Sequence, residues 1–152
     1  MGLRRQARGV VLQGLFMCDA LADYSPECYD LYLSHFEVPA QALEYSKSLG
    51  LGILKNITAI DTEISCSSEH WSLNRMSRVD RNILRIATYE MLYCNDISPQ
   101  ISIDEAIEIA KRYGSEHSPN FVNGVLDQTA ARLSRRTETV DDSIPATGTT
   151  GR

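Results

Sequence analysis

Residues 77–94 read SRVDRNILRIATYEMLYC, and this stretch indicates what kind of fold the chain adopts. Ser77 is followed three positions later by an acid, Asp80, which is the capping pattern that opens many helices. Apolar side chains then recur at three- and four-residue intervals, as on the buried face of a helix. We therefore predict a helix over 78–94. The apolar face holds Val79, Ile83, Ile86 and Ala87.

The segments on either side carry the same helical spacing, and no run alternates as a strand does. The predicted fold class is all-α, a compact bundle of about six to seven helices. Serine and proline mark several of the helix starts, and Gly114 suits a left-handed cap at a helix end. The other predicted helices cover 3–22, a short segment from Pro26, a long segment from Pro39 to about Ile64, 103–113 after a second capping pattern at Ser102 and Glu105, and a last segment after Ser118-Pro119.

The length and composition fit one soluble domain. The chain has 152 residues and a formal net charge of -5, with 43% hydrophobic and 23% charged residues. These values are ordinary for a globular protein, and no apolar run approaches the length of about 18 residues that a membrane span needs. We expect one helical domain over 1–133, a disordered tail over 134–152 that is rich in Thr, Ser, Asp and Gly, and a cytoplasmic location.

No motif for catalysis or cofactor binding is visible in the sequence. The four cysteines form no Cys-x-x-Cys pair, and the three histidines supply no helical metal pair. Glycine-rich phosphate loops and the usual nucleophile spacings are also missing. The sequence thus favours a protein that is not an enzyme and has no cofactor, with free and mostly buried thiols. A metal site built from distant ligands stays open as an alternative.

The beginning of this acidic chain is basic. Residues 3–16 read LRRQARGVVLQGLF and contain Arg4, Arg5 and Arg8, with no acid before position 19. On a helix, Leu12 and Phe16 project among these charges, away from the apolar face. One interpretation is a central helix that neighbours cover on several sides. The other is a composite surface on which arginine binds phosphate and the apolar groups contact a protein partner.

Other conspicuous residues have structural interpretations that we favour over functional ones. Arg78, Arg81 and Arg85 form a stripe that could meet RNA but fits pairing with internal acids better. Glu90 lies on an apolar face and needs an arginine or backbone partner. The single tryptophan, Trp71, is interpreted as a core anchor.

Five segments together resemble the NusB transcription-antitermination family, in matching order and spacing over about residues 4 to 133. The resemblance implies a compact helical domain without catalytic activity. It also implies binding of a short single-stranded RNA element called boxA, together with a ribosomal small-subunit protein that acts as NusE, in an antitermination complex with RNA polymerase. The segments are RRQAR at 4–8, LQGLF at 12–16, DRNILRIATYEM at 80–91, ISIDEAIEIAKRYG at 101–114 and FVNGVLD at 121–127.

The resemblance also implies which residues carry these functions. RNA contacts fall on the arginine-rich start of the chain and on the turn before the last helix. The partner contacts fall on Phe16 and Asp80, and Leu12 is the neighbouring apolar candidate. Asp80 can serve both the partner and the helix cap. The expected RNA-binding residues are Arg4, Arg5, Arg8, Ser118, Asn120 and Phe121.

Three positions depart from the family pattern, and two alternative functions stay open. Phe16 replaces a common tyrosine, His117 a common acid and Asn120 a common lysine, which makes the turn the less secure RNA contact. A related helical domain precedes the catalytic domain of some ribosomal RNA cytosine methyltransferases, but the chain ends about where such a domain would begin. The other alternative is a homodimer that associates through Leu12 and Phe16.

Overall fold

The computed structural model describes residues 2–35 and 37–143, and over these residues the chain is helical with no strand. The prediction of an all-α fold is confirmed. The helices are α1 (Leu3–Leu21), α2 (Pro26–Ser34), α3 (Ala40–Lys55), α4 (Ile57–Ser67), α5 (Arg78–Tyr93), α6 (Pro99–Tyr113) and α7 (Ser118–Ser143), with one 3-10 turn, η1 (Leu73–Arg75).

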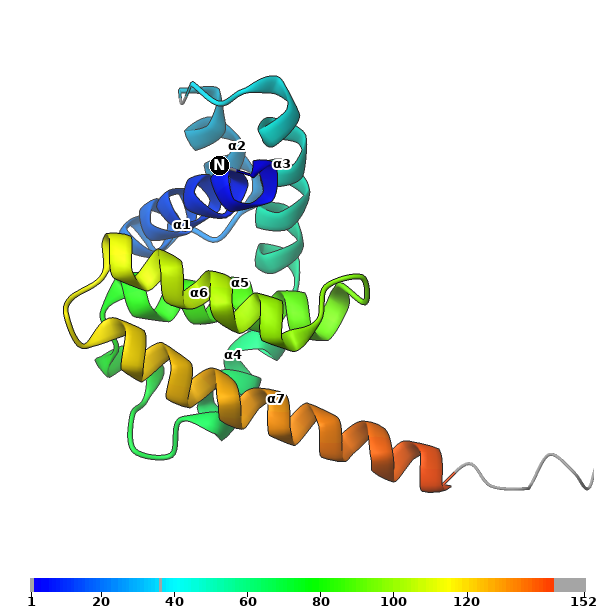
Figure 1. Ribbon diagram of the computed structural model, residues 1–152. Helices are drawn as coiled ribbons and strands as arrows, with labels where there is room; N and C mark the ends of the chain where they lie inside the picture. The colour runs from blue at the N-terminus through cyan, green and yellow to red at the C-terminus, as the bar shows by residue number, and fades with distance from the viewer. Residues whose placement is uncertain (1, 36, 144–152) are drawn as a thin grey trace, which may run out of the picture.

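Helix α5, which contains most of the stretch quoted first, lies at the centre of the bundle. It packs against α1, α3, α4, α6 and α7, and the residues from Asn82 to Thr88 are all buried. Figure 1 shows α6 crossing beside α5, with α1 on one side of this pair and α7 on the other. The middle of this helix therefore faces other helices on all sides, while Arg78 in its first turn stays exposed. The buried Arg85 and Glu90 need partners inside the protein.

Two helix starts differ from the prediction. The long segment from Pro39 is two helices, because Asn56 takes a non-helical backbone conformation and its side-chain amide bonds the Gly52 carbonyl at 2.8 Å. Helix α6 begins at Pro99 rather than at Ile103, and Ser98 caps it. The second capping pattern was misleading, since Ser102 lies inside α6 and its hydroxyl donates to Glu90.

Glycine at position 50 has a packing reason that the sequence does not reveal. A Cβ at Gly50 would lie 2.0 Å from Cζ of Tyr29, whose ring is fully buried between α2 and α3. The Tyr29 hydroxyl donates to the Ser46 carbonyl at 2.7 Å, so the ring cannot move aside freely. The lower helix propensity of this glycine is thus offset by close packing of α2 on α3.

Helix α7 continues beyond the predicted end of the ordered domain. Residues 134–143 were expected to be disordered, but they belong to this helix. Arg136 in this extension donates to Glu63 of α4 at 2.6 Å, and Arg132, just before the extension, donates to the same carboxylate at 3.0 Å. The rest of the predicted tail, 144–152, lies outside the described residues.

Candidate functional site

The first turns of α1 place two arginines on the surface, and both are already paired with acids. Arg4 donates to Asp96 at 2.9 Å. Arg5 makes two parallel bonds to Glu105 of α6, at 2.9 and 2.7 Å. The hydrogen bond from Arg5 is the main reason that the pKa of Glu105 is lowered, and the bond from Arg4 has the same effect on the pKa of Asp96. A phosphate that binds either arginine therefore competes with a carboxylate.

Arg8 was predicted to lie on this surface, and that prediction is wrong. Its side chain is buried, with the whole residue 4% exposed. The guanidinium donates to Glu90 at 2.7 Å, and Glu90 also accepts a bond from Ser102 at 2.9 Å. The expectation that Glu90 needs an arginine is therefore confirmed. Arg8 joins α1 to α5 inside the protein and is not available to RNA in this arrangement.

Of the two apolar residues that project among the charges of α1, one is buried and one is exposed. Leu12 is 2% exposed, so its predicted place on a partner surface is wrong. For Leu12 the other interpretation is the right one: neighbouring helices cover α1 on several sides, because α3 and α5 both pack on it. Phe16 is 40% exposed, one turn further on. An apolar contact surface therefore begins at Phe16 and continues onto exposed Met17 and Leu21.

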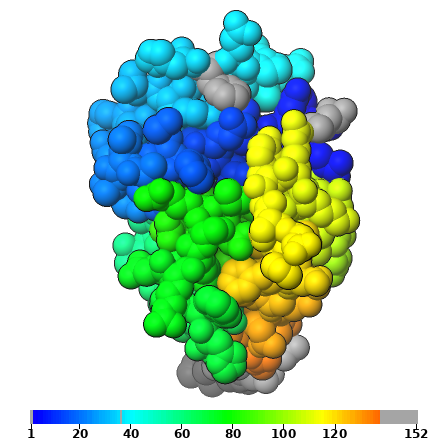
Figure 2. Space-filling model, turned by 90° about the vertical axis from the view of Figure 1, so that its left-hand side faces the viewer, coloured from blue at the N-terminus to red at the C-terminus, as the bar shows by residue number. Residues whose placement is uncertain are grey.

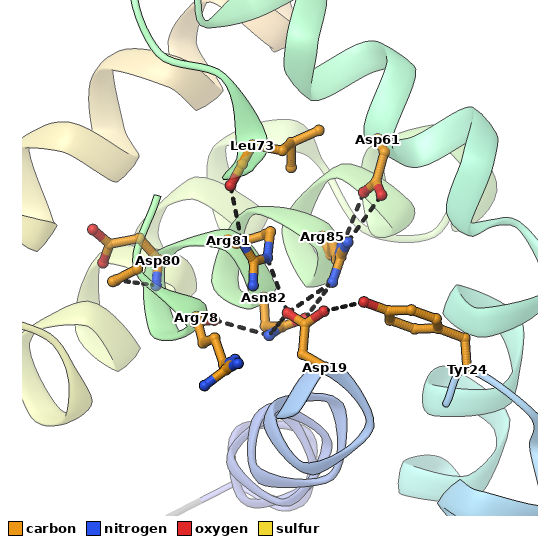
Figure 3. A network of polar contacts seen from close by, with 10 residues as sticks. Asp19, Tyr24, Asp61, Leu73, Arg78, Asp80, Arg81, Asn82 and Arg85 are labelled. Carbon is orange, nitrogen blue, oxygen red and sulfur yellow. Dashed lines mark hydrogen bonds and ion pairs between the residues drawn. The ribbon is translucent and has the colours of Figure 1, made fainter. Parts of the chain in front are cut away.

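A buried ion-pair network joins the end of α1 to α5 (Figure 3). Asp19 accepts bonds from Arg81 at 2.9 Å, from Asn82 at 2.9 Å and from Arg85 at 3.2 Å. The Tyr24 hydroxyl donates to its other oxygen. Burial by itself would raise the pKa of Asp19, but the hydrogen bond from Tyr24, the charge of Arg85 and the remaining bonds together lower it. The network uses Arg81 and Arg85 for internal pairing, as the favoured interpretation of the stripe predicted.

Asp80 lies on the first turn of α5, beside this network. The Ser77 side chain accepts a bond from the Asp80 amide at 3.1 Å, so the predicted cap at Ser77 is present. The Asp80 carboxylate makes no return bond to the backbone, and its Oδ1 is buried without a hydrogen-bond partner among the described residues. Figure 3 shows this carboxylate pointing away from Asp19. The return bond of the predicted capping box is thus absent, and the role of Asp80 toward a partner stays a prediction.

The three candidate residues at the turn between α6 and α7 differ in their exposure to solvent. Asn120 is exposed and Phe121 is half-buried, but Ser118 is buried. The Ser118 side chain accepts a bond from the Ser115 amide at 3.0 Å and so shapes the turn. Gly114 is extended rather than left-handed, with φ -93°. Glycine is needed there because a Cβ would lie 2.4 Å from the Ser118 hydroxyl.

Trp71 is a surface residue that the sequence interpretation assigned to the core. It is 51% exposed and contacts Phe121 edge to face, with ring centroids 6.3 Å apart. Both rings line a hollow of about 260 Å³, which Asn120 and His70 also line. Figure 2 shows the segment before α5, in green, beside the start of α7, in yellow and orange. The two rings form an exposed aromatic surface of the kind on which unpaired bases stack.

The described residues contain no group of three or more His, Cys, Asp or Glu side chains that could hold a metal ion. Within the same residues, no helix is both long and apolar enough to cross a membrane. The sulfur atoms of Cys18 and Cys28 lie 3.7 Å apart. Burial raises the pKa of the Cys18 thiol to about 12. A thiol held protonated in this way is a poor nucleophile.

These features define a helical binding protein with a basic end, an exposed aromatic surface and an apolar patch. Comparison with known proteins then identifies the family. The NusB family model matches residues 5–131. The curated antitermination protein NusB of Syntrophus aciditrophicus is 38% identical over 145 residues, which cover 95% of this chain and 90% of that protein. The NusB protein of Trichlorobacter lovleyi is 43% identical over 86% of this chain and 92% of its own length. The chain belongs to the NusB family.

Solved structures agree with this assignment. A structure of T. maritima NusB superposes with a TM-score of 0.75 at 44% identity, covering 84% of this chain and 90% of that one. A crystal structure of the antitermination factors NusB and NusE in complex with double-stranded RNA matches with a TM-score of 0.73 at 26% identity, over 86% of this chain and 97% of that one. The resemblance drawn from the five sequence segments is thus confirmed, and this chain is a transcription antitermination protein rather than an enzyme.

Proposed function

We propose that this chain binds a boxA-like single-stranded RNA element together with the ribosomal protein NusE, in the cytoplasm, and so joins an RNA polymerase antitermination complex. The observation that carries the proposal is the division of α1 into two exposed ends. Arg4 and Arg5 lie at its start and Phe16 near its finish, while buried residues occupy the turns between them. One helix thus presents a phosphate-binding end and an apolar protein-binding end.

The RNA surface in this proposal has two parts. Arg4 and Arg5 bind phosphates, in competition with the carboxylates described above. Phe121 and Trp71 stack unpaired bases, and Asn120 at their edge supplies an amide that can hydrogen-bond a base. Ser118 acts indirectly, because its side chain fixes the turn that carries Asn120 and Phe121. The proposed partner surface consists of exposed Phe16 on α1 and half-buried Asp80 at the start of α5.

Replacing Arg5 by alanine is expected to weaken RNA binding about tenfold and to reduce the slope of log affinity against log salt by about 0.7, since one phosphate contact is lost. The measurement is fluorescence anisotropy of a labelled boxA-like RNA over a salt series, with a scrambled RNA beside it. Lys55→Ala, on exposed α3 surface, is the control and should change neither quantity. Equal affinity of the wild type and Arg5→Ala would count against the RNA assignment.

Replacing Phe16 by aspartate is expected to weaken NusE binding at least tenfold, because a charge then faces an apolar contact. Isothermal titration calorimetry with purified NusE measures this affinity. Leu31→Asp is the matched control, since Leu31 is an exposed apolar residue on α2. If both variants bind NusE as the wild type does, Phe16 is not at the interface. If Phe16→Asp instead breaks up a homodimer in sedimentation, the self-association alternative takes its place.

A further inference from the structure

The space between α1 and α6 forms a groove of about 490 Å³, a volume suited to a small organic molecule or a nucleotide. Its floor is apolar, with Val10 and Ile109 buried at the base. The space in front of Gly9 is open: a Cβ at this position would come near only the Tyr113 hydroxyl, at 3.4 Å. A larger side chain at position 9 would therefore extend into the groove. The groove residues are Arg5, Gln6, Gly9, Val10 and Gln13 of α1, with Glu108, Ile109, Lys111, Arg112 and Tyr113 of α6.

The charge on the groove is positive. Its lining holds three cations and one acid, Glu108, which pairs with Lys111 at 3.2 Å. Arg5 is paired with Glu105, outside the groove lining. Arg112 has no carboxylate partner in the part of the chain that the structure describes. Its guanidinium instead lies over the Tyr113 ring, 5.2 Å from the centroid. This contact positions the cation without neutralising it, so Arg112 is free to accept an anionic group.

The groove also joins the two parts of the proposed RNA surface. At one end Arg5 belongs both to the groove and to the hollow around Arg4. At the other end Tyr113 ends α6, and a short loop joins it to the start of α7, which carries Asn120 and Phe121, on the same side of the molecule (Figure 1). A single strand that contacts both parts has a direct path along this groove.

We propose that the groove between α1 and α6 binds the single-stranded RNA between its two end contacts, with one phosphate on Arg112. Gln6 and Gln13 line the same space with neutral amides that can donate to bases or to the backbone. The inference rests on the proposed RNA-binding function and deepens it, because it assigns the strand a continuous path. Positive charge favours RNA over an acidic or apolar protein segment as the occupant.

Two variants of the full chain test this path by different means, in anisotropy titrations with the boxA-like RNA. Arg112→Gln removes the charge, and we expect about fivefold weaker binding with a salt slope reduced by about 0.7. Gly9→Leu fills the groove without changing charge and should weaken binding at least as much. Lys55→Gln on α3 removes the same charge outside the groove and should leave affinity unchanged. Circular dichroism checks the fold of Gly9→Leu, and if that variant unfolds, Arg112→Gln decides by itself.

The outcomes separate this inference from the function on which it rests. If wild-type binding is selective and sensitive to Arg5→Ala, but unaffected in Arg112→Gln and in folded Gly9→Leu, the groove path is wrong and the function stands. If the wild type shows no preference for the boxA-like RNA, the proposed function fails and the path with it. If Gly9→Leu changes sedimentation but not RNA affinity, the groove holds a second copy of the chain, which also overturns the RNA path.

Discussion

Replacing Glu90 by alanine is expected to lower the free energy of unfolding by about 3–5 kcal/mol, because it leaves a buried arginine without its closest partner. The side chains of Arg8 and Glu90 are 5% and 1% exposed, and their contact is 2.7 Å. The remaining acid near Arg8, Glu105, is 3.4 Å away and already holds Arg5. Urea unfolding followed by circular dichroism gives the free energy.

The control for this experiment is Glu108→Ala, which removes an exposed surface pair with Lys111. Such pairs contribute about 0–1 kcal/mol. The double variant Arg8→Met/Glu90→Met should lose less than the sum of the two single variants, since no charge is then stranded. A loss below about 1 kcal/mol in Glu90→Ala would contradict the proposed importance of this pair for stability.

The second large effect is expected at Asp19, whose replacement by alanine should lower the free energy of unfolding by about 3 kcal/mol. The change removes the acceptor for Arg81, Asn82 and Arg85 at once. The loss should not exceed that in Glu90→Ala, because Arg85 keeps two bonds to Asp61. Urea unfolding measures it, with Asp30→Ala on the exposed surface of α2 as the control.

The Asp19 effect should also depend on pH. The pKa of Asp19 is lowered in the folded protein, so its ionised form stabilises the fold above the pKa of the unfolded chain. That contribution is lost as the pH falls from the unfolded pKa through the lowered folded pKa. The difference between the wild type and Asp19→Ala should therefore shrink in acid. A difference that stays constant down to acid unfolding would mean that the lost stability comes from packing rather than from charge.

Helical periodicity was sufficient to predict the fold class, and local capping signals placed most helix starts. They failed where two local signals compete and where long-range contacts decide the structure. Ser102 has the spacing of a cap, yet it lies within α6 because Ser98 and Pro99 open the helix earlier. The extension of α7 carries few apolar residues, so a core-based argument ended it too soon. The ion pair from Arg136 in this extension to Glu63 depends on a helix far away in the sequence.

The residues of the candidate site were predicted only in part, again because packing between helices is not visible in the sequence. A helical projection separates faces, but it cannot say which face a neighbouring helix covers. Arg8 and Leu12 share the face of Arg5 and Phe16 in projection, and only the packing of α3 and α5 separates buried from exposed. Trp71 was assigned to the core because large aromatic residues usually bury their area. Its contact with Phe121 joins segments that the sequence keeps apart, and no local pattern signals it.

The Asp19 network has a consequence for the kinetics of assembly. Phe16 and Asp80 belong to different helices, but Asp19 follows Phe16 by less than one turn and holds Arg81, the neighbour of Asp80. The two helices are therefore locked in register before any partner arrives. A partner that touches both residues meets a rigid template, so little ordering entropy is lost on association. We expect docking in a single step at a rate limited by encounter, without a slow rearrangement of this chain.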